Sequence, residues 1–177
     1  MSLLITLLLS SAFSSDLSID TTYSYIKYIG NHPLHSWTGI SKDIDFKLDC
    51  NIDDCIISVS TPLEKFNSGN DSRDSNMLYY TEALSYPRVS FQSNSFKFNE
   101  KIDKSINING TLNFHGIDKK IPLKIVLNNQ NDELWATCDF NFNLDLFNIE
   151  RPSLLMIKID NSIEIETKFK LIKKNEK

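Results

Sequence analysis

Apolar and polar residues alternate with a period of two over long stretches of the sequence. In residues 106–114, 134–146 and 163–171, nearly every second residue is apolar, and most of the residues between them are polar or charged. Successive side chains of a β-strand point to opposite faces, so this alternation is typical of strands with one buried face. Antiparallel sheets commonly present their strands in this way. We therefore predict an all-β chain built from antiparallel strands.

Clusters of turn-forming residues separate the alternating stretches. Two of them are residues 31–33, with the sequence Asn-His-Pro, and residues 116–118, with the sequence Gly-Ile-Asp. Several strands joined by short connections predict an antiparallel barrel or sandwich. The sequence predicts eight strands, at residues 22–29, 39–48, 55–61, 88–98, 106–114, 121–127, 134–146 and 163–171.

One segment departs from this alternation. Met77 and Leu84 follow the spacing of a helical face, Asp71 or Ser72 is suited to cap the helix N-terminus, and Pro87 would end the segment. We predict one short helix between the third and fourth strands. In a barrel, this helix would close one mouth.

The amino-terminal residues have the pattern of a secretion signal. The apolar run at residues 3–9 is too short to span a bilayer. Ala12 and Ser14 place small residues at the two positions that a signal peptidase recognises. We predict a signal peptide at residues 1–14 and one domain at residues 15–177, a length that suits a single domain.

The sequence does not decide whether two of the cysteines are disulfide-bonded or free. Cys50 and Cys55 bracket a plausible hairpin turn and could form a disulfide in an oxidising compartment, or both could be free. Cys138 has no obvious partner, and we expect it to be a small core residue.

Composition and motifs exclude several classes of function. The chain has 19 Lys plus Arg against 23 Asp plus Glu, and this net charge of −4 without a dominant basic patch argues against nucleic-acid binding. His32, His35 and His115 lack the spacing of metal ligands relative to cysteines or carboxylates. No serine lies in a G-x-S-x-G elbow. We predict no metal site, no catalytic residues and no required cofactor.

The interior of the predicted barrel can be filled or hollow. An eight-stranded barrel is near the size at which side chains fill the interior or leave room for one small ligand. The predicted inner face is free of charge, so a cavity there would suit a hydrocarbon chain, with about 0.8 kcal/mol for each buried CH₂. A packed core without a cavity is the alternative.

Five segments, in the same order along the chain, resemble the YceI-like family. The last of them has Asn148 where a glycine is common, and asparagine tolerates the left-handed conformation that such a turn needs. The segments are residues 35–39 (HSWTG), 66–77 (FNSGNDSRDSNM), 86–91 (YPRVSF), 110–117 (GTLNFHGI) and 147–149 (FNI).

This resemblance implies a lipocalin-like, eight-stranded antiparallel barrel that holds a polyisoprenoid or an isoprenoid quinone in its apolar interior. It implies a periplasmic or secreted carrier or reservoir that is not an enzyme, does not span the membrane and does not bind nucleic acid. Whether it forms a homodimer is left open. The main alternative is a structural or interaction module without a cavity. An enzyme for a hydrophobic substrate and a small outer-membrane barrel are further alternatives.

Candidate ligand-binding residues follow from the inward stripe and from the family-like segments. Arg73 could meet a lipid head group, or its pairing with Asp74 could tie the helix and its loop to the rim. His35 and Trp37 could contact a quinone head, or could pack where a strand begins. The inward candidates, each of which could equally be plain core, are Met77, Phe91, Leu112, Phe114, Leu123, Ile125, Phe140, Phe142, Leu144, Ile165 and Phe169.

Overall fold

The computed structural model describes residues 17–173 except 52–53, 99–103 and 132. The predicted signal peptide at residues 1–14 lies outside the described residues. Every described strand pair is antiparallel. The strands are β1 (Leu17–Ile19), β2 (Tyr25–His32), β3 (His35–Ser41), β4 (Asp45–Asn51), β5 (Asp54–Pro62), β6 (Arg88–Ser93), β7 (Phe96–Lys97), β8 (Ser105–Phe114), β9 (Ile117–Gln130), β10 (Glu133–Asn143), β11 (Ser153–Leu154), β12 (Ile157–Lys158) and β13 (Ser162–Lys173).

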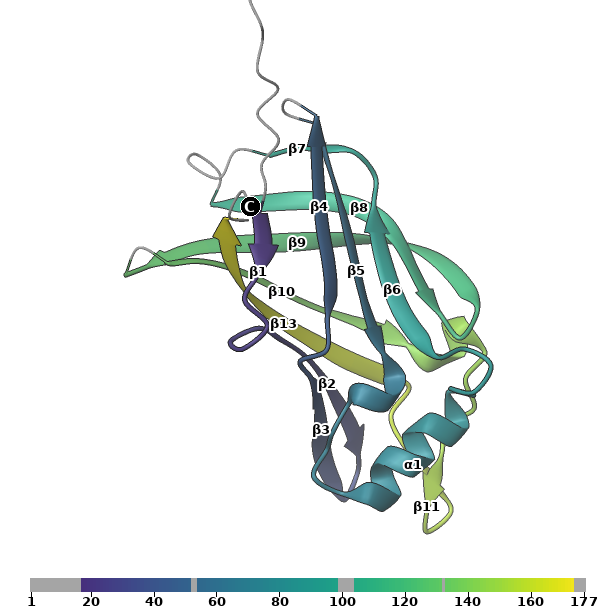
Figure 1. Cartoon of the computed structure of the whole chain (residues 1–177). Coiled ribbons are helices and arrows are strands. Elements are labelled where there is room, and N and C mark those ends of the chain that lie inside the picture. Colours follow the sequence, from purple (N-terminus) through teal and green to yellow (C-terminus); the bar gives the residue numbers. More distant parts are fainter. Residues whose placement is uncertain (1–16, 52–53, 99–103, 132, 174–177) are drawn as a thin grey trace, which may run out of the picture.

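The main sheet has 11 strands and curves strongly on itself (Figure 1). Its order is β3-β2-β13-β10-β9-β8-β6-β5-β4, with β1 added to β13 and β7 added to β5, and β11 and β12 form a separate two-stranded ribbon. Backbone pairing between the end strands β3 and β4 is not found in the described part of the chain. The predicted antiparallel β architecture is confirmed, whereas the prediction of eight strands is wrong and closure into a barrel by backbone pairing is not observed.

Other contacts bridge much of the seam between the two ends of the sheet. β1 pairs with β13 and also lies against β4. Near the other end of the seam, Ile40 of β3 exchanges two backbone hydrogen bonds of 3.0 Å with Asn67 in the loop before the helix. Next to Ile40, the buried Ser41 hydroxyl lies 2.9 Å from that of Thr61 in β5. The seam is therefore held by a short strand, a loop and a side-chain hydrogen bond.

Two of the predicted strands are interrupted in the structure. The predicted strand 39–48 is divided between β3 and β4, because the chain leaves one end of the sheet after Ser41 and joins the other end at Asp45. The Ser41 hydroxyl accepts a hydrogen bond from the backbone N–H of Asp43 in this connection. The predicted strand 88–98 is divided between β6 and β7.

The predicted strand 134–146 ends at Asn143 and continues as the 3-10 helix η2 (Leu144–Phe147). This change of period buries Leu144 and leaves Leu146 half exposed, so the predicted inward stripe does not extend to Leu146. Asn148 follows η2 with φ of 55°. Asparagine therefore adopts the left-handed conformation expected of it at this turn.

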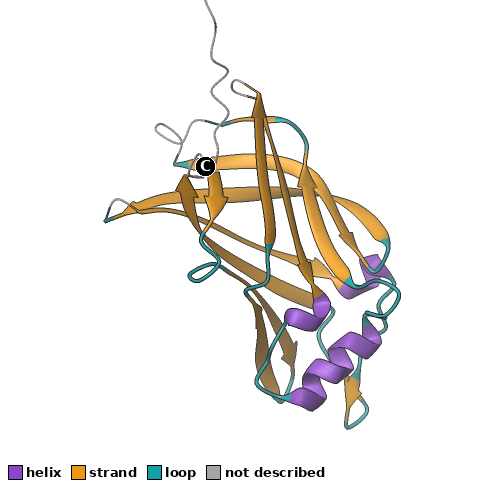
Figure 2. Ribbon diagram, viewed as in Figure 1, coloured by secondary structure: helices purple, strands orange, loops and turns teal. Residues whose placement is uncertain are grey.

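The predicted helix is present between β5 and β6, but its bounds differ from the prediction. It is α1 (Asp71–Tyr80), and its N-cap is Asn70, whose side chain accepts a hydrogen bond of 2.9 Å from the backbone of Arg73. Asp71 and Ser72 are therefore within the helix. The helix ends well before Pro87, which leaves Leu84 fully exposed in the following turns. Figure 2 shows α1, η2 and the 3-10 helix η1 (Leu63–Lys65) gathered towards one end of the sheet.

Candidate functional site

The concave face of the curved sheet encloses an apolar cavity with a volume of about 420 Å³. The period-two pattern places alternate residues of each strand on this face, as in β8, where Ile108, Leu112 and Phe114 are buried and Asn107 and Asn109 are exposed. A volume of this size lies within the range of small-molecule sites, roughly 300–1,000 Å³.

All of the predicted ligand-lining residues lie on the wall of this cavity. Whether they bind a ligand stays a prediction, but the structure brings them together around one space. They are His35, Trp37, Arg73, Met77, Phe91, Leu112, Phe114, Leu123, Ile125, Phe140, Phe142, Leu144, Ile165 and Phe169.

The cavity reaches the surface where the β2–β3 hairpin, α1 and the β11–β12 ribbon meet. Among the described lining residues, the exposed ones are His35, Asn76, Ser153 and Leu154, and these come from those three elements. We call these four residues the mouth. Figure 1 shows α1 and β11 beside the β2–β3 hairpin at this end. Lining residues from β7, β8 and β9, such as Phe96 and Ile125, are not exposed.

Tyr28 is a wall residue that the sequence analysis missed. Its hydroxyl is buried, and no hydrogen bond of ordinary geometry to it is found among the described residues. The pKa of Tyr28 is raised to about 12, mainly by burial and also by the Asp74 carboxylate, whereas the Arg73 charge and a hydrogen bond with the Trp37 side chain act to lower it. A hydroxyl on the wall of an apolar cavity without a hydrogen bond of ordinary geometry can donate one to a polar group that enters, or accept one from it.

Two glycines allow aromatic rings to lie across neighbouring strands. Gly39 is the register partner of Tyr28, and Gly30 is the partner of Trp37. A Cβ atom at either glycine would collide with the ring opposite. The signal that could have identified Tyr28 is therefore this pairing of an aromatic residue with a glycine, which becomes visible only when the strand register is known.

Arg73 and Asp74 play different parts in the structure. The Asp74 carboxylate accepts hydrogen bonds of 3.1 and 3.2 Å from the backbone N–H of Ser68, so it ties α1 to the loop before it. The guanidinium carbon of Arg73 lies 6.0 Å from the centroid of the Trp37 ring. Within the described residues, no carboxylate forms an ion pair with Arg73. Its charge faces the wall of the cavity near the mouth.

The rings of His32, His35 and Trp37 form a row along the β2–β3 hairpin. Their centroids are 5.8 Å apart between the histidines and 5.6 Å apart between His35 and Trp37. The Nδ1 atom of His32 accepts a hydrogen bond from the Leu34 backbone, which leaves Nε2 to donate to the Ile157 carbonyl at 3.2 Å. All three residues line the cavity, and His32 also joins the hairpin to the β11–β12 ribbon.

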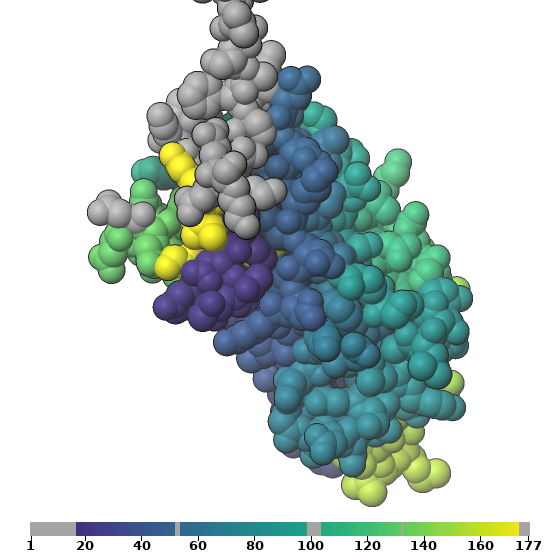
Figure 3. Space-filling model, in the orientation of Figure 1, coloured from purple at the N-terminus to yellow at the C-terminus, as the bar shows by residue number. Residues whose placement is uncertain are grey.

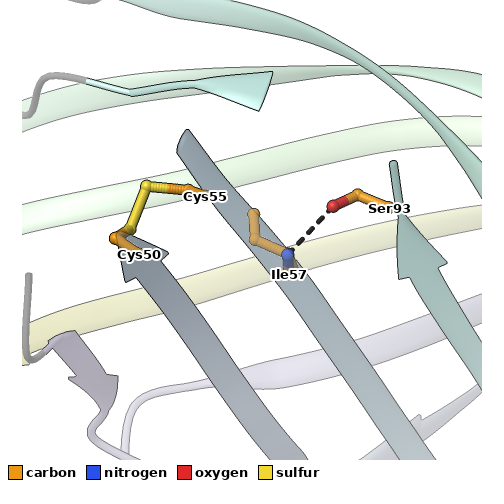
Figure 4. Close-up of a disulfide and its surroundings, with 4 residues drawn as sticks. All are labelled: Cys50, Cys55, Ile57 and Ser93. Atoms are coloured by element: carbon orange, nitrogen blue, oxygen red, sulfur yellow. Dashed lines mark hydrogen bonds between the residues drawn. A yellow bond between two sulfur atoms is a disulfide. The ribbon is translucent and has the colours of Figure 1, made fainter. Parts of the chain in front are cut away.

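Cys50 and Cys55 form a disulfide between the paired strands β4 and β5 (Figure 4). Residues 52–53 of the predicted turn between them lie outside the described residues. Nearby, the Ser93 hydroxyl accepts a hydrogen bond of 2.9 Å from the backbone N–H of Ile57, at a point where the pairing of β5 passes from β6 to β7. Cys138 is a buried free cysteine on the cavity wall, and burial raises the pKa of its thiol to about 11.

Within the described residues, no group of three or more His, Cys, Asp or Glu side chains is placed to hold a metal ion. None of the helices in this part of the chain is long and apolar enough to cross a bilayer.

Comparisons with known proteins identify the fold. A polyisoprenoid-binding domain from Saccharophagus degradans is similar, with a TM-score of 0.73 and 12% identity over 90% of this chain and 99% of that one. BcnA from Burkholderia cenocepacia has a TM-score of 0.71 and 11% identity over 88% of this chain and 99% of that one. The YceI protein of Campylobacter jejuni has a TM-score of 0.55 and 18% identity over 78% of this chain and 85% of that one.

At these identities, the structural likenesses show a shared fold alone. No curated protein sequence matches the chain. The model of the YceI-like domain, in contrast, matches residues 17–171. This match extends over nearly all of the described chain, and the protein therefore belongs to the YceI-like domain family.

Proposed function

We propose that the protein binds one isoprenoid lipid, a polyisoprenoid or an isoprenoid quinone, and acts as its carrier or reservoir without catalysing a reaction. The observation that carries this proposal is the cavity of about 420 Å³, whose wall is formed mainly by aliphatic and aromatic side chains. Such a wall binds by apolar burial and dispersion rather than by hydrogen bonds. About ten buried CH₂ groups would contribute roughly 8 kcal/mol before the costs of association.

The polar groups of the wall support one orientation of this ligand. The Tyr28 hydroxyl and the Arg73 guanidinium both lie near the mouth, beside Trp37. The wall formed by β8 and β9 is apolar at Ile106, Leu123 and Ile125. A ligand with one polar end would place that end near Tyr28 and Arg73, and its hydrocarbon chain would lie along the apolar wall formed by β8 and β9.

The chemistry of the ligand has a parallel in a structural neighbour, because the similar domain from Saccharophagus degradans is described as polyisoprenoid-binding. The periplasm is the proposed location. The disulfide between Cys50 and Cys55 fits an oxidising compartment of this kind, and so does the secretion signal expected at residues 1–14.

Mass spectrometry of an organic extract tests this function. The protein is purified without detergent from a bacterial periplasm, and its extract should contain an isoprenoid lipid in about equal molar amount. An Ala136→Phe variant adds a ring inside the cavity and should lose the lipid. The matched control, Asn141→Phe, adds the same ring on the exposed face of the same strand and should retain it.

Two results would overturn the proposed function. One is protein free of lipid that also fails to bind added isoprenoids, which would favour the structural or interaction module. The other is equal lipid content in the Ala136→Phe variant and the wild type, which would place the lipid outside the cavity.

A further inference from the structure

The β11–β12 hairpin presents an apolar tip to solvent. Leu155 is 75% exposed and Met156 is 99% exposed, and the flanking pair Leu154 and Ile157 is 45% exposed at each residue. Leu154 pairs with Ile157, so Leu155 and Met156 alone form the turn. Side chains of this size usually lie in the interior, and a contiguous exposed group of them marks a contact with another surface.

The backbone of the turn makes these residue types more unusual. Leu155 and Met156 have φ of 52° and 68°. A two-residue turn with both φ values positive favours asparagine and glycine, and side chains such as these are strained there. Neither the conformation nor the packing of the hairpin explains why two large apolar residues occupy its turn.

The hairpin lies at the mouth of the cavity. Ser153 and Leu154 line the cavity, and the tip projects from the molecule beyond α1 (Figure 3). Hydrogen bonds hold its base in place, from the Asp160 N–H to the Asn31 carbonyl at 2.8 Å and from the ring of His32 to Ile157. The tip is therefore on a fixed support rather than on a free loop.

One exposed cation, Lys158, lies beside the apolar tip and can meet a phosphate-bearing surface. Arg151, at the base of the hairpin, is half-buried and forms an ion pair with Asp145 at 3.8 Å, and the exposed Glu150 and Asp160 lie one residue beyond the segment 151–159. On the neighbouring β2–β3 hairpin, exposed Leu34 lies between His32 and His35. Exposed apolar side chains beside a lysine, as at Ile157 and Lys158, are typical of segments that enter the interface of an anionic bilayer.

We propose that Leu155 and Met156 insert into a lipid bilayer and dock the mouth of the cavity on its surface, so that an isoprenoid passes between membrane and cavity. This role rests on the proposed function, since the cargo is a membrane lipid. A second protein fits the tip less well, because a stable protein interface buries roughly 1,200 Å² or more in total, which a two-residue turn cannot supply.

Vesicle co-sedimentation tests the docking. The probes are vesicles of phosphatidylethanolamine with phosphatidylglycerol, and vesicles of phosphatidylcholine alone. The variant is Leu155→Asn with Met156→Gly, which removes both apolar side chains and supplies the residues that this turn favours, so that the hairpin stays folded. The partition coefficient of this variant onto anionic vesicles should be ~10-fold or more below that of the wild type. Leu84→Ser, a change at a fully exposed leucine after α1, should bind like the wild type.

Fluorescence locates the inserted residue. Relative to the wild type, which emits from Trp37 and Trp135, Met156→Trp should add emission that shifts to the blue when anionic vesicles are added, and Leu84→Trp should not. Equal vesicle binding by the wild type and the Asn-Gly variant would overturn the proposal. So would a concentration-dependent dimer, detected by sedimentation, that the Asn-Gly variant abolishes while vesicle binding persists.

The lipid content of each preparation separates this proposal from the proposed function. If the Asn-Gly variant still yields lipid on extraction but no longer binds vesicles, the result supports both the docking and the carrier function. If the wild type contains lipid but does not bind vesicles, the docking is overturned and the carrier function stands. Vesicle binding by protein that neither contains nor takes up an isoprenoid leaves the docking standing and overturns the carrier function.

Discussion

The hydroxyl groups of Ser41 and Thr61 lie 2.9 Å apart, and both residues are almost completely buried. Ser41 is the last residue of β3, at one end of the sheet, and Thr61 belongs to β5, next to the strand at the other end. This hydrogen bond therefore crosses the seam where backbone pairing is not found. It holds the two ends of the sheet together beside the cavity, whose wall includes Thr61.

We expect Thr61→Val to lower the free energy of unfolding by about 1–3 kcal/mol, because the change keeps the shape of the side chain and removes one partner of a buried hydrogen bond. Ser41→Ala should act similarly. Urea unfolding of both variants and of the double variant measures the coupling, and the double variant should lose less than the sum of the two. Thr38→Val, on the exposed part of β3, should stay within about 0.5 kcal/mol of the wild type. Strict additivity would mean that the two hydroxyls do not interact.

The disulfide should contribute to stability by restricting the unfolded chain. Its cysteines are 5 positions apart in sequence. A loop this short corresponds to about 2 kcal/mol in the chain-entropy description of a disulfide. Urea unfolding with and without a reductant should show this difference for the wild type. A variant with both Cys50→Ala and Cys55→Ala should not respond to the reductant, and a response there would assign the effect to another group.

The Cys138 thiol should be slow to alkylate in the folded protein. Its pKa is raised from 9.0 to about 11 by burial, so at pH 8 its thiolate is roughly a hundred times less abundant than for a thiol at the ordinary value. The iodoacetamide rate, followed by mass spectrometry, should rise about tenfold per pH unit from pH 8 to pH 10. A rate that levels off near pH 9 would contradict the raised pKa.

The same shift affects stability. Because the pKa is higher in the folded state, the contribution of this thiol is fully present below about pH 9. It is lost as pH rises from 9 to about 11. Unfolding in urea should return the alkylation rate to that of an ordinary cysteine. This measurement is the control for the raised pKa of Cys138, on which both the slow alkylation and the pH dependence of stability depend.

The cavity wall could be predicted from the sequence because burial on one face of a strand imposes a period of two. Leu112 and Ile165 are far apart in sequence, yet each belongs to an alternating stretch and each lines the cavity. The division of residues 39–48 could not be predicted in this way. Ser41, Lys42 and Asp43 are three consecutive polar residues that interrupt the alternation, but a polar run does not show that the chain crosses there from one end of the sheet to the other.

The polar part of the wall was predicted incompletely for a related reason. Trp37 and Arg73 belong to family-like segments, whereas Tyr28 does not. Its position depends on the register that places it opposite Gly39. The apolar tip at Leu155 and Met156 was missed because two large apolar residues in a turn contradict the usual preference for polar and small residues there. Such departures from local preference are expected where a segment has a function.

Tyr28→Phe should separate recognition of a polar end from recognition of a hydrocarbon. The Tyr28 hydroxyl makes no hydrogen bond of ordinary geometry among the described residues, so its removal should change the free energy of unfolding little. Geranylgeraniol, which has a hydroxyl at one end, should bind the variant about 5- to 10-fold more weakly than the wild type, as expected for one lost hydrogen bond. Squalene, a pure hydrocarbon, should bind both proteins equally.

Quenching of tryptophan fluorescence during titration with each ligand measures these affinities, since Trp37 lines the cavity beside Tyr28. Tyr25→Phe is the matched control, because Tyr25 is on the same strand but is not part of the cavity wall. It should bind both ligands like the wild type. Equal weakening of geranylgeraniol and squalene by Tyr28→Phe would mean that the ring packs against the chain while the hydroxyl makes no contact with the polar end. In that case the polar end of the ligand would have to lie elsewhere along the wall.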